Sequence, residues 1–408
     1  MKKSFIFGAA LMLAGAFGFQ SCSQESNPGV PTEAAIDNGT ELAAAITGFA
    51  KDGVLTLPKN VVELNVAADI DLSQVEIKNA SPLTLNVAKG VKITVAKNLN
   101  NISFNGDAEG PATIEAKETV AISGTEEAPI GIANANFIIA NNFTLENAII
   151  DASKVSDPFI ALTSEPTVAF LPKSDGTGDT DYYGISNILL KNVTLTGVKN
   201  SIIYDNDKKY CVVDLTIDDC VIGLATEATM NQAIISFKQG GVKDFAMKNS
   251  TVYQTAEAEN NYFLRYNNSA RLDRYGFDKN TETQSINFLN NTFYNVNKNG
   301  QWGNYGGIAG QAYSEFHVVG NIWVDCGNGQ ISRRLLGGRN ASSYKTCEFN
   351  NNTYWFNGAA ETGNTNYDAG TQLATDPAFK DAANADFTPT GADQVSNKTG
   401  DPRWFAAE

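Results

Sequence analysis

The feature that most constrains this 408-residue chain is an eight-residue frame that recurs seven times from Phe143 onward. Its first, third and eighth residues are apolar or aromatic, and its fifth is Asn, Asp or Gly, which turn the backbone readily. Alternation of period two before a turn residue predicts a strand, a corner and a second strand. The copies begin at Phe143, Ile188, Leu215, Phe245, Ile286, Phe316 and Cys347.

Spacing between the copies indicates how they are arranged. The fifth residues, separated by 45, 27, 30, 41, 30 and 31 positions, are Asn147, Asn192, Asp219, Asn249, Asn290, Gly320 and Asn351. One frame interrupted by loops of varying length is typical of a solenoid rather than of a two-layer sandwich. We expect the corner asparagines, among 44 Asn in the chain, to stack and to satisfy one another's amides.

Further short strands complete each repeat. Residues 55–140 continue the apolar alternation, and Thr40 begins a short apolar helix toward Gly53 that would cover the first repeat. The sequence therefore predicts an all-β fold, a single-stranded right-handed parallel β-helix with an N-terminal capping helix. A second strand series is expected at residues 159–162, 202–204, 234–237, 263–265 and 331–333.

The first residues predict export. Lys2 and Lys3 precede an apolar run over residues 5–19 that ends at Ser21 and Cys22. This segment resembles the lipoprotein signals of Bacteroidetes, which implies that Cys22 is lipidated and holds the protein at the outer membrane. The alternative is soluble secretion with Cys22 an ordinary thiol. We divide the chain into a signal peptide (1–21), a flexible tether (22–31) and a β-helix domain (32–408), and expect a monomer.

Composition excludes other classes of function. The net charge of −15 becomes −17 without Lys2 and Lys3, which argues against nucleic acid as a partner. No run of about 20 apolar residues follows residue 19, which argues against a multispan membrane protein. His317, the only histidine, lies mid-strand without a nucleophile motif. No CxxC pair occurs, so small core residues are favoured over two disulfides for Cys211, Cys220, Cys326 and Cys347.

Both ends of the domain resemble a known group. The helix, Asp52-Gly53 and the strand that follows are similar to the N-terminal cap of pectate-lyase-like β-helices. Residues 376–381 and 386–387 resemble the segment that often closes carbohydrate-active β-helix proteins, and residues 400–404 resemble a tail of β-helix lipoproteins of Bacteroidetes. The resemblance implies polysaccharide as the partner and leaves the activity open.

Basic residues of the second strand series suggest a ligand. Lys238, Arg265 and Arg333 or Arg334 occupy comparable places, and a row of cations suits a polyanion such as a uronate polymer. The alternative is that these cations solubilise the surface or pair with Asp205 and Glu257.

The order of Lys238 and Arg265 also resembles that in chondroitinase B and in alginate lyases of β-helix type. There, a Lys is the base and an Arg one repeat later is the acid, which implies these roles for Lys238 and Arg265. Those lyases place calcium-binding acids just before the Lys and a His after the Arg. Calcium and any other cofactor are therefore not expected, because this chain has Asn231, Gln232, Ala233 and Tyr266 at those positions.

Aromatic residues provide a competing ligand site. Trp302 and Tyr305 fall in a segment rich in Gly and Asn, where we expect a loop whose rings stack on sugar faces. Together, the evidence favours a lipoprotein that binds polysaccharide without catalysis, in glycan capture or processing. A uronate lyase and a structural or adhesive surface protein remain alternatives, and the glycan and the side of the membrane stay open.

Overall fold

The computed structural model describes residues 35–116, 124–125, 128–129, 137–166, 182–225, 233–255, 262–337, 339–361, 368 and 370–405. The signal peptide, the tether and Cys22 lie outside the described residues. The protein is mostly β-strand, so the all-β class is confirmed, and most strands pair in parallel. Among the helices of the described ranges, none is long and apolar enough to cross a bilayer.

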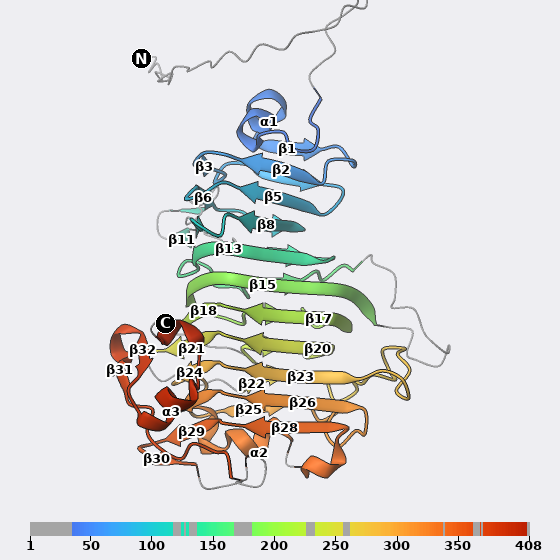
Figure 1. The fold of residues 1–408 in the computed structure, drawn as a ribbon. Coiled ribbons are helices and arrows are strands. Elements are labelled where there is room, and N and C mark those ends of the chain that lie inside the picture. The colour runs from blue at the N-terminus through green and yellow to red at the C-terminus, as the bar shows by residue number, and fades with distance from the viewer. Residues whose placement is uncertain are drawn as a thin grey trace, which may run out of the picture. The chain divides into compact units, whose positions relative to one another are not determined.

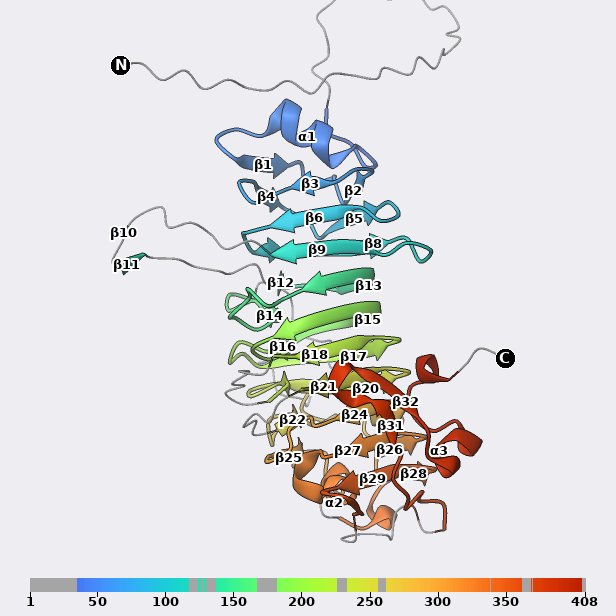
Figure 2. The same cartoon turned by 90° about the vertical axis from the view of Figure 1, so that its left-hand side faces the viewer.

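Parallel strands form three series, and each strand pairs with its equivalent in the next repeat (Figures 1 and 2). The first series contains β2 (Glu63–Val66), β5 (Leu83–Val87), β8 (Ile102–Gly106), β13 (Phe143–Asp151), β15 (Tyr183–Val198), β17 (Tyr210–Asp218), β20 (Gly241–Lys248), β23 (Gln284–Leu289), β26 (Ser314–Val319) and β28 (Thr346–Asn350). Strands β13 and β15 run on into the second series, which also has β3 (Ile70–Asp71), β6 (Lys92–Val95), β9 (Ala112–Ala116), β18 (Val221–Leu224), β21 (Thr251–Gln254), β24 (Thr292–Tyr294), β27 (Ile322–Val324) and β29 (Thr353–Phe356).

The third series contains β7 (Leu99–Asn100), β12 (Phe137–Ile139), β14 (Ile160–Leu162), β16 (Ile203–Tyr204), β19 (Ile235–Ser236), β22 (Tyr262–Arg265) and β25 (Gln301–Asn304). A separate parallel pair is formed by β1 (Val54–Leu57) and β4 (Glu76–Asn79). The remaining strands, β10 (Gly124–Thr125), β11 (Ala128–Pro129), β30 (Ala359–Ala360), β31 (Phe379–Asp381) and β32 (Asp386–Pro389), pair antiparallel. The helices are α1 (Leu42–Phe49), α2 (Ile331–Leu335) and α3 (Ala392–Asn397), with 3₁₀ turns at Gly327–Gly329, Ala341–Ser343, Ala382–Asn384 and Pro402–Trp404.

The register confirms the eight-residue frame. Parallel pairing places the first residues of all seven copies in one row, from Phe143 to Cys347. Every fifth residue has positive φ, between 49° for Asn249 and 68° for Gly320. Asn, Asp and Gly tolerate this left-handed conformation best, which explains their restriction to that position.

The expected contact between corner asparagines is present from Asn192 Nδ2 to Asn147 Oδ1 at 2.8 Å, but in the last repeats the buried amide ladder lies one residue later than we expected. Asn249 and Asn290 at the fifth position are half-exposed, whereas the sixth residues Asn291, Asn321 and Asn352 are fully buried. The Oδ1 atom of each accepts from the residue one repeat before it, at 3.0 Å from the N–H of Asn291 to Asn321 and from that of Asn321 to Asn352. The fifth residue therefore sets the backbone conformation of the corner, and the side chain of the sixth residue pairs with the buried N–H group of the preceding repeat.

Inward-facing side chains fill the space between the three series. The Trp323 ring stacks between Phe293, at 5.4 Å between centroids, and Tyr354, at 5.2 Å. Cys211, Cys220 and Cys326 are buried, Cys347 is half-buried, and all four are free thiols, so the prediction of small core residues is confirmed. Burial raises the pKa of each of these four thiols, which keeps them protonated.

The ends of the domain agree only in part with expectation. The N-terminal helix is present as α1, but its N-cap is Glu41, which makes no side-chain cap bond, and the Thr40 hydroxyl accepts the N–H of Asp37 instead. The C-terminal segment, expected to close the last repeat, lies along the side of the second strand series from β21 to β29, where Gln394 Nε2 donates to the Thr353 hydroxyl at 3.0 Å (Figure 1). The Asp401 carboxylate accepts from the Thr251 hydroxyl at 2.7 Å, and Phe387 packs on Tyr253.

The ladder predicts where corner asparagines are needed for stability. Asn321→Ala should lower the free energy of unfolding by about 1–3 kcal/mol, because it removes the acceptor of the buried Asn291 N–H and the side-chain donor to the Phe288 carbonyl. Asn290→Gly, a matched corner change that keeps positive φ accessible, should stay within about 0.5 kcal/mol. Urea denaturation measures both, and equal losses would contradict separate roles for the two positions.

Candidate functional site

Lys238 lies in the turn after β19 and is half-buried. Its Nζ atom is 2.9 Å from Oδ1 of Asp207, whose carboxylate is itself 47% exposed. Lys238 therefore forms an ion pair, as the alternative interpretation predicted, but its partner is Asp207 and not Asp205. Glu257, the other predicted partner, lies outside the described residues. Such a surface pair contributes little stability and leaves Lys238 with a neighbouring anion.

Arg265 does not lie in one row with Lys238. The parallel register pairs Arg265 at the end of β22 with Ser236 of β19 and with Asn304 of β25. Lys238 follows Ser236 by two residues, in the turn beyond the strand. The expected row of cations in the third series is therefore offset by two positions.

Arg333 and Arg334 are not in the strand series at all, which corrects the expectation for residues 331–333. They belong to helix α2, where Arg333 is exposed and Arg334 is half-buried. Glu361 holds the start of this helix, because its carboxylate accepts the Ile331 N–H at 2.9 Å and the Ser332 hydroxyl at 2.8 Å. The short apolar pattern of residues 331–333 could not distinguish one helical turn from a strand.

Trp302 and Tyr305 belong to the core, which corrects their prediction as loop residues that stack on sugars. Trp302 lies on β25 with no exposed surface, and its ring stacks on Phe263 at 4.2 Å between centroids. The Tyr305 hydroxyl donates to the Leu335 carbonyl at 2.6 Å, and burial raises its pKa. A side chain at Gly303 would collide with the Tyr305 ring, so that glycine makes room for packing rather than for a turn.

The turn that carries Lys238 is held by a buried carboxylate. Asp205 has no exposed surface and accepts the N–H groups of Gln239 at 2.7 Å and of Gly240 at 2.8 Å. Burial raises the pKa of Asp205 to about 6, although these hydrogen bonds oppose the shift. Asp205 therefore has a structural role at this turn.

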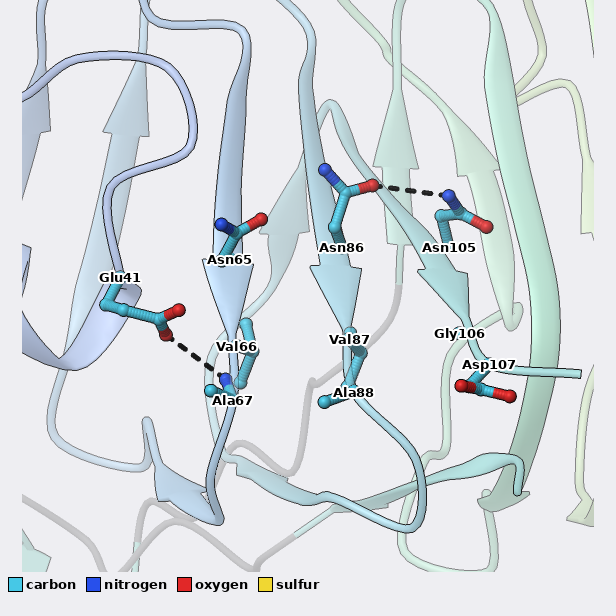
Figure 3. A pocket seen from close by; sticks show the side chains of 10 residues that line it. All are labelled: Glu41, Asn65, Val66, Ala67, Asn86, Val87, Ala88, Asn105, Gly106 and Asp107. Atoms are coloured by element: carbon cyan, nitrogen blue, oxygen red, sulfur yellow. Dashed lines mark hydrogen bonds between the residues drawn. The ribbon is translucent and has the colours of Figure 1, made fainter. Parts of the chain in front are cut away.

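A hollow of about 460 Å³ lies in the first repeats of the chain, over β2, β5 and β8 (Figure 3). Asn65, Asn86 and Asn105 project into it side by side, because the register places them in one row across the three strands. Glu41 extends the row at one end through a bridge to Asn65, and Asp107 lines the hollow beyond Asn105.

Longer corners explain why this hollow is confined to the first repeats. In the later repeats only two residues separate a strand of the first series from the strand of the second series that follows it, as between Asp218 of β17 and Val221 of β18. In the first repeats the corners are residues 67–69, 88–91 and 107–111, without the left-handed Asn of the frame. These wider corners, with only methyl side chains at Ala67 and Ala88, leave space beside the amide row.

The amide row has free hydrogen-bonding capacity. Asn105 Nδ2 donates to Asn86 Oδ1 at 3.2 Å, and Asn65 Nδ2 donates to the Gly39 carbonyl at 2.8 Å. Within the described ranges, Asn86 Nδ2 and Asn105 Oδ1 have no protein partner. Each amide offers a donor and an acceptor in one plane, a geometry that suits neighbouring hydroxyl groups. The sequence signal was present in the repeated triplets Leu64-Asn65-Val66, Leu85-Asn86-Val87 and Phe104-Asn105-Gly106.

Cations gather in a different hollow, of about 290 Å³, in the loop between β22 and β23. Arg271, Arg274 and Lys279 line it together with Asp273 and Asp278. Arg271 Nε is 3.4 Å from Asp273 Oδ1, so this cation is already offset by a carboxylate. With both signs of charge in the same loop, these cations are better explained as surface residues that pair with nearby acids than as a binding site for an anion.

Just before Lys238, where the β-helix lyases that this chain resembles carry calcium-binding acids, stand Asn231, Gln232 and Ala233. Asn231 and Gln232 lie outside the described residues, and Ala233 is fully buried. Over the ranges that the structure covers, no group of three or more His, Cys, Asp or Glu side chains could hold a metal ion.

Comparison with protein-family models, with curated proteins and with solved structures found no match. Function is therefore argued from the chemistry of the sites alone. The hollow of Figure 3 is the stronger candidate, because several aligned polar groups face open space there.

Asp205 predicts a pH dependence of stability. Since its pKa is about 6 when folded and about 4 in an unfolded chain, the folded state binds the proton more tightly between these values. The free energy of unfolding should therefore fall as pH rises from 4 to 6, by up to about 1.4 kcal/mol per pH unit for this group. Asp368, whose pKa burial also raises to about 6, contributes a fall in the same window.

Urea denaturation at pH 4.5, 5.5 and 6.5 measures this slope. Asp205→Asn should flatten it, because the amide does not titrate, whereas Asp207→Asn at the exposed partner of Lys238 should leave it unchanged. An unaltered slope in Asp205→Asn would contradict the assignment.

Proposed function

We propose that the repeated strands form a right-handed parallel β-helix. The proposal is supported by the in-register parallel pairing of equivalent strands and by the left-handed residue at every corner from Asn147 to Asn351. Strands that pair only with the preceding and following repeat are what a solenoid requires. Helix α1, whose Leu42 and Ala45 are buried, supports a covering role at the first repeats.

We infer that the chain is a lipoprotein anchored through Cys22 at the outer membrane. Support comes from the sequence, in which Lys2 and Lys3 precede the apolar run and Cys22 follows it. The resemblance to Bacteroidetes lipoproteins favours lipid anchoring over soluble secretion.

We propose that this lipoprotein binds polysaccharide without cleaving it, in glycan capture or processing. The observation that carries the proposal is the row Asn65, Asn86 and Asn105 in an open hollow, with donor and acceptor atoms that no described residue uses. A row of amides repeated across parallel strands, which lie about 4.8 Å apart, suits a polymer with regularly repeated hydroxyl groups.

A uronate lyase with Lys238 as base and Arg265 as acid is less well supported. Lys238 lies against Asp207, and the register offsets it from Arg265 by two positions. A structural or adhesive surface role remains the second alternative.

Lipid anchoring predicts the behaviour of Cys22→Ser. The variant should leave the membrane fraction and appear in the soluble fraction, because lipidation at this residue would be lost. Cys347→Ser, a change at a half-buried thiol of the domain, is the matched control and should remain with the membrane. Fractionation and immunoblotting measure both, and membrane association of Cys22→Ser would refute the anchor.

Glycan binding predicts the effect of Asn86→Ala. The purified full-length chain should bind at least one polysaccharide of an array, and Asn86→Ala should weaken that affinity about fivefold, which corresponds to about 1 kcal/mol for a lost hydrogen bond. Asn350→Ala, in the same register row but far from the hollow, should bind as the wild type does. Equal affinities for the two variants would move the site elsewhere, and no binding to any glycan would favour the structural alternative.

The same material distinguishes the lyase. Uronate polymers incubated with the wild type should give no ultraviolet absorbance from unsaturated products, with or without calcium. If absorbance appears and Lys238→Ala abolishes it while binding survives, the chain is an enzyme, since a base acts mainly on the transition state.

A further inference from the structure

The charged side chains at the amide hollow are all acidic. Among the described residues, Glu41 and Asp107 are its only ionisable lining residues, and no Lys or Arg lines it. Glu41 Oε2 accepts the Ala67 N–H at 3.2 Å, and Asp107 Oδ1 accepts the Glu109 N–H at 2.8 Å. For the portion of the chain described, the second oxygen of each carboxylate has no hydrogen-bond partner. Two acceptor atoms with negative charge therefore face the same space as the amides (Figure 3).

We propose that this hollow takes a neutral, hydroxyl-rich saccharide and rejects uronates, an inference that rests on the proposed glycan binding. Sugar hydroxyls can donate to Glu41 and Asp107 and can accept from Asn86 Nδ2, which together satisfy both kinds of group. A uronate carboxylate cannot donate, and it would add a third negative charge where two already lie. The ligand class is thus the opposite of the polyanion suggested by Lys238 and Arg265.

The geometry also sets the direction of the bound chain. The amide row crosses β2, β5 and β8 at right angles to the strands, since the three residues are direct parallel neighbours. A saccharide that contacts all three amides must therefore lie across the strands, along the stacking direction. Binding should consequently strengthen from a monosaccharide to an oligosaccharide and then level off, because the hollow ends at Glu41 and Asp107.

Gly106, one position after the last amide of the row, allows the next repeat to approach closely. A side chain there would collide with the carbonyl of Asn147, which begins the regular corners, while Asn147 Nδ2 donates to the Gly106 carbonyl at 2.8 Å.

Removing the two charges should change selectivity rather than abolish binding. The double variant Glu41→Gln, Asp107→Asn keeps an acceptor oxygen for the Ala67 and Glu109 N–H groups, so the corners should remain folded. The full-length protein would be titrated with oligomers of glucan, xylan, mannan and galactan and with oligogalacturonate. Wild type should bind at least one neutral oligomer at least tenfold more tightly than oligogalacturonate, and the double variant should reduce that ratio to about threefold or less.

A matched control removes the same net charge outside the hollow. The double variant Glu63→Gln, Glu109→Gln alters two exposed acids of the same repeats that do not line the hollow, and it should keep the wild-type ratio. Salt gives an independent readout: because screening weakens repulsion, 1 M NaCl should strengthen oligogalacturonate binding by the wild type and not by the Glu41, Asp107 variant. Binding to a cationic site would weaken with salt instead.

The outcomes separate the two levels of the proposal. Wild-type preference for oligogalacturonate, or an equal change of selectivity in the two double variants, would overturn the neutral-ligand inference while glycan binding stands. If Asn86→Ala loses neutral-glycan binding but the double variant Glu41→Gln, Asp107→Asn keeps the wild-type selectivity, the glycan site is supported and only the role of the carboxylates is refuted. Failure of the wild type to bind any saccharide would overturn both.

Discussion

Parallel pairing in register from β13 onward depends on a corner at the same place in every repeat. In this chain one residue per repeat meets that requirement with left-handed backbone, from Asn147 to Asn351. The residue after it is buried at the corner, where Asn291, Asn321 and Asn352 bond to one another and to carbonyls of the neighbouring repeats. In these repeats the two positions hold the corners in phase, so that the inward rows of apolar side chains stack on one another.

Where the left-handed corner is missing, a polar hollow lies beside the strands. The amide row Asn65, Asn86 and Asn105 occupies outward-facing strand positions, in register with Glu146 of β13, and the longer turns of the first repeats leave space beside it. The same residue type thus has two roles: on the outward face of a strand it lines the hollow, and at the sixth frame position it is buried. Position relative to the corner, rather than residue identity, separates structural asparagines from candidate ligand-binding ones.

Aromatic residues show a similar dependence on packing. Trp302, Trp323 and Phe293 lie together inside the repeats, and Tyr305 bonds to the backbone of helix α2. Large rings fill a wide interior that short aliphatic residues would leave partly empty. They are therefore unavailable to stack on sugars, and glycan binding on this chain is better argued from planar amides and carboxylates on the outside.

The sequence alone determined the class of the fold and the register of seven repeats, because period-two alternation and turn residues are local properties that recur at each copy. It placed the corners and the amide contact between Asn147 and Asn192, but it missed the buried ladder at the sixth residue of the last repeats. Only the tertiary structure decided that Trp302 is core, that residues 331–333 form a helix, and that Lys238 and Arg265 are out of row. Burial, register between distant strands and the width of a corner depend on neighbours some 20 to 40 residues away, which no local pattern encodes.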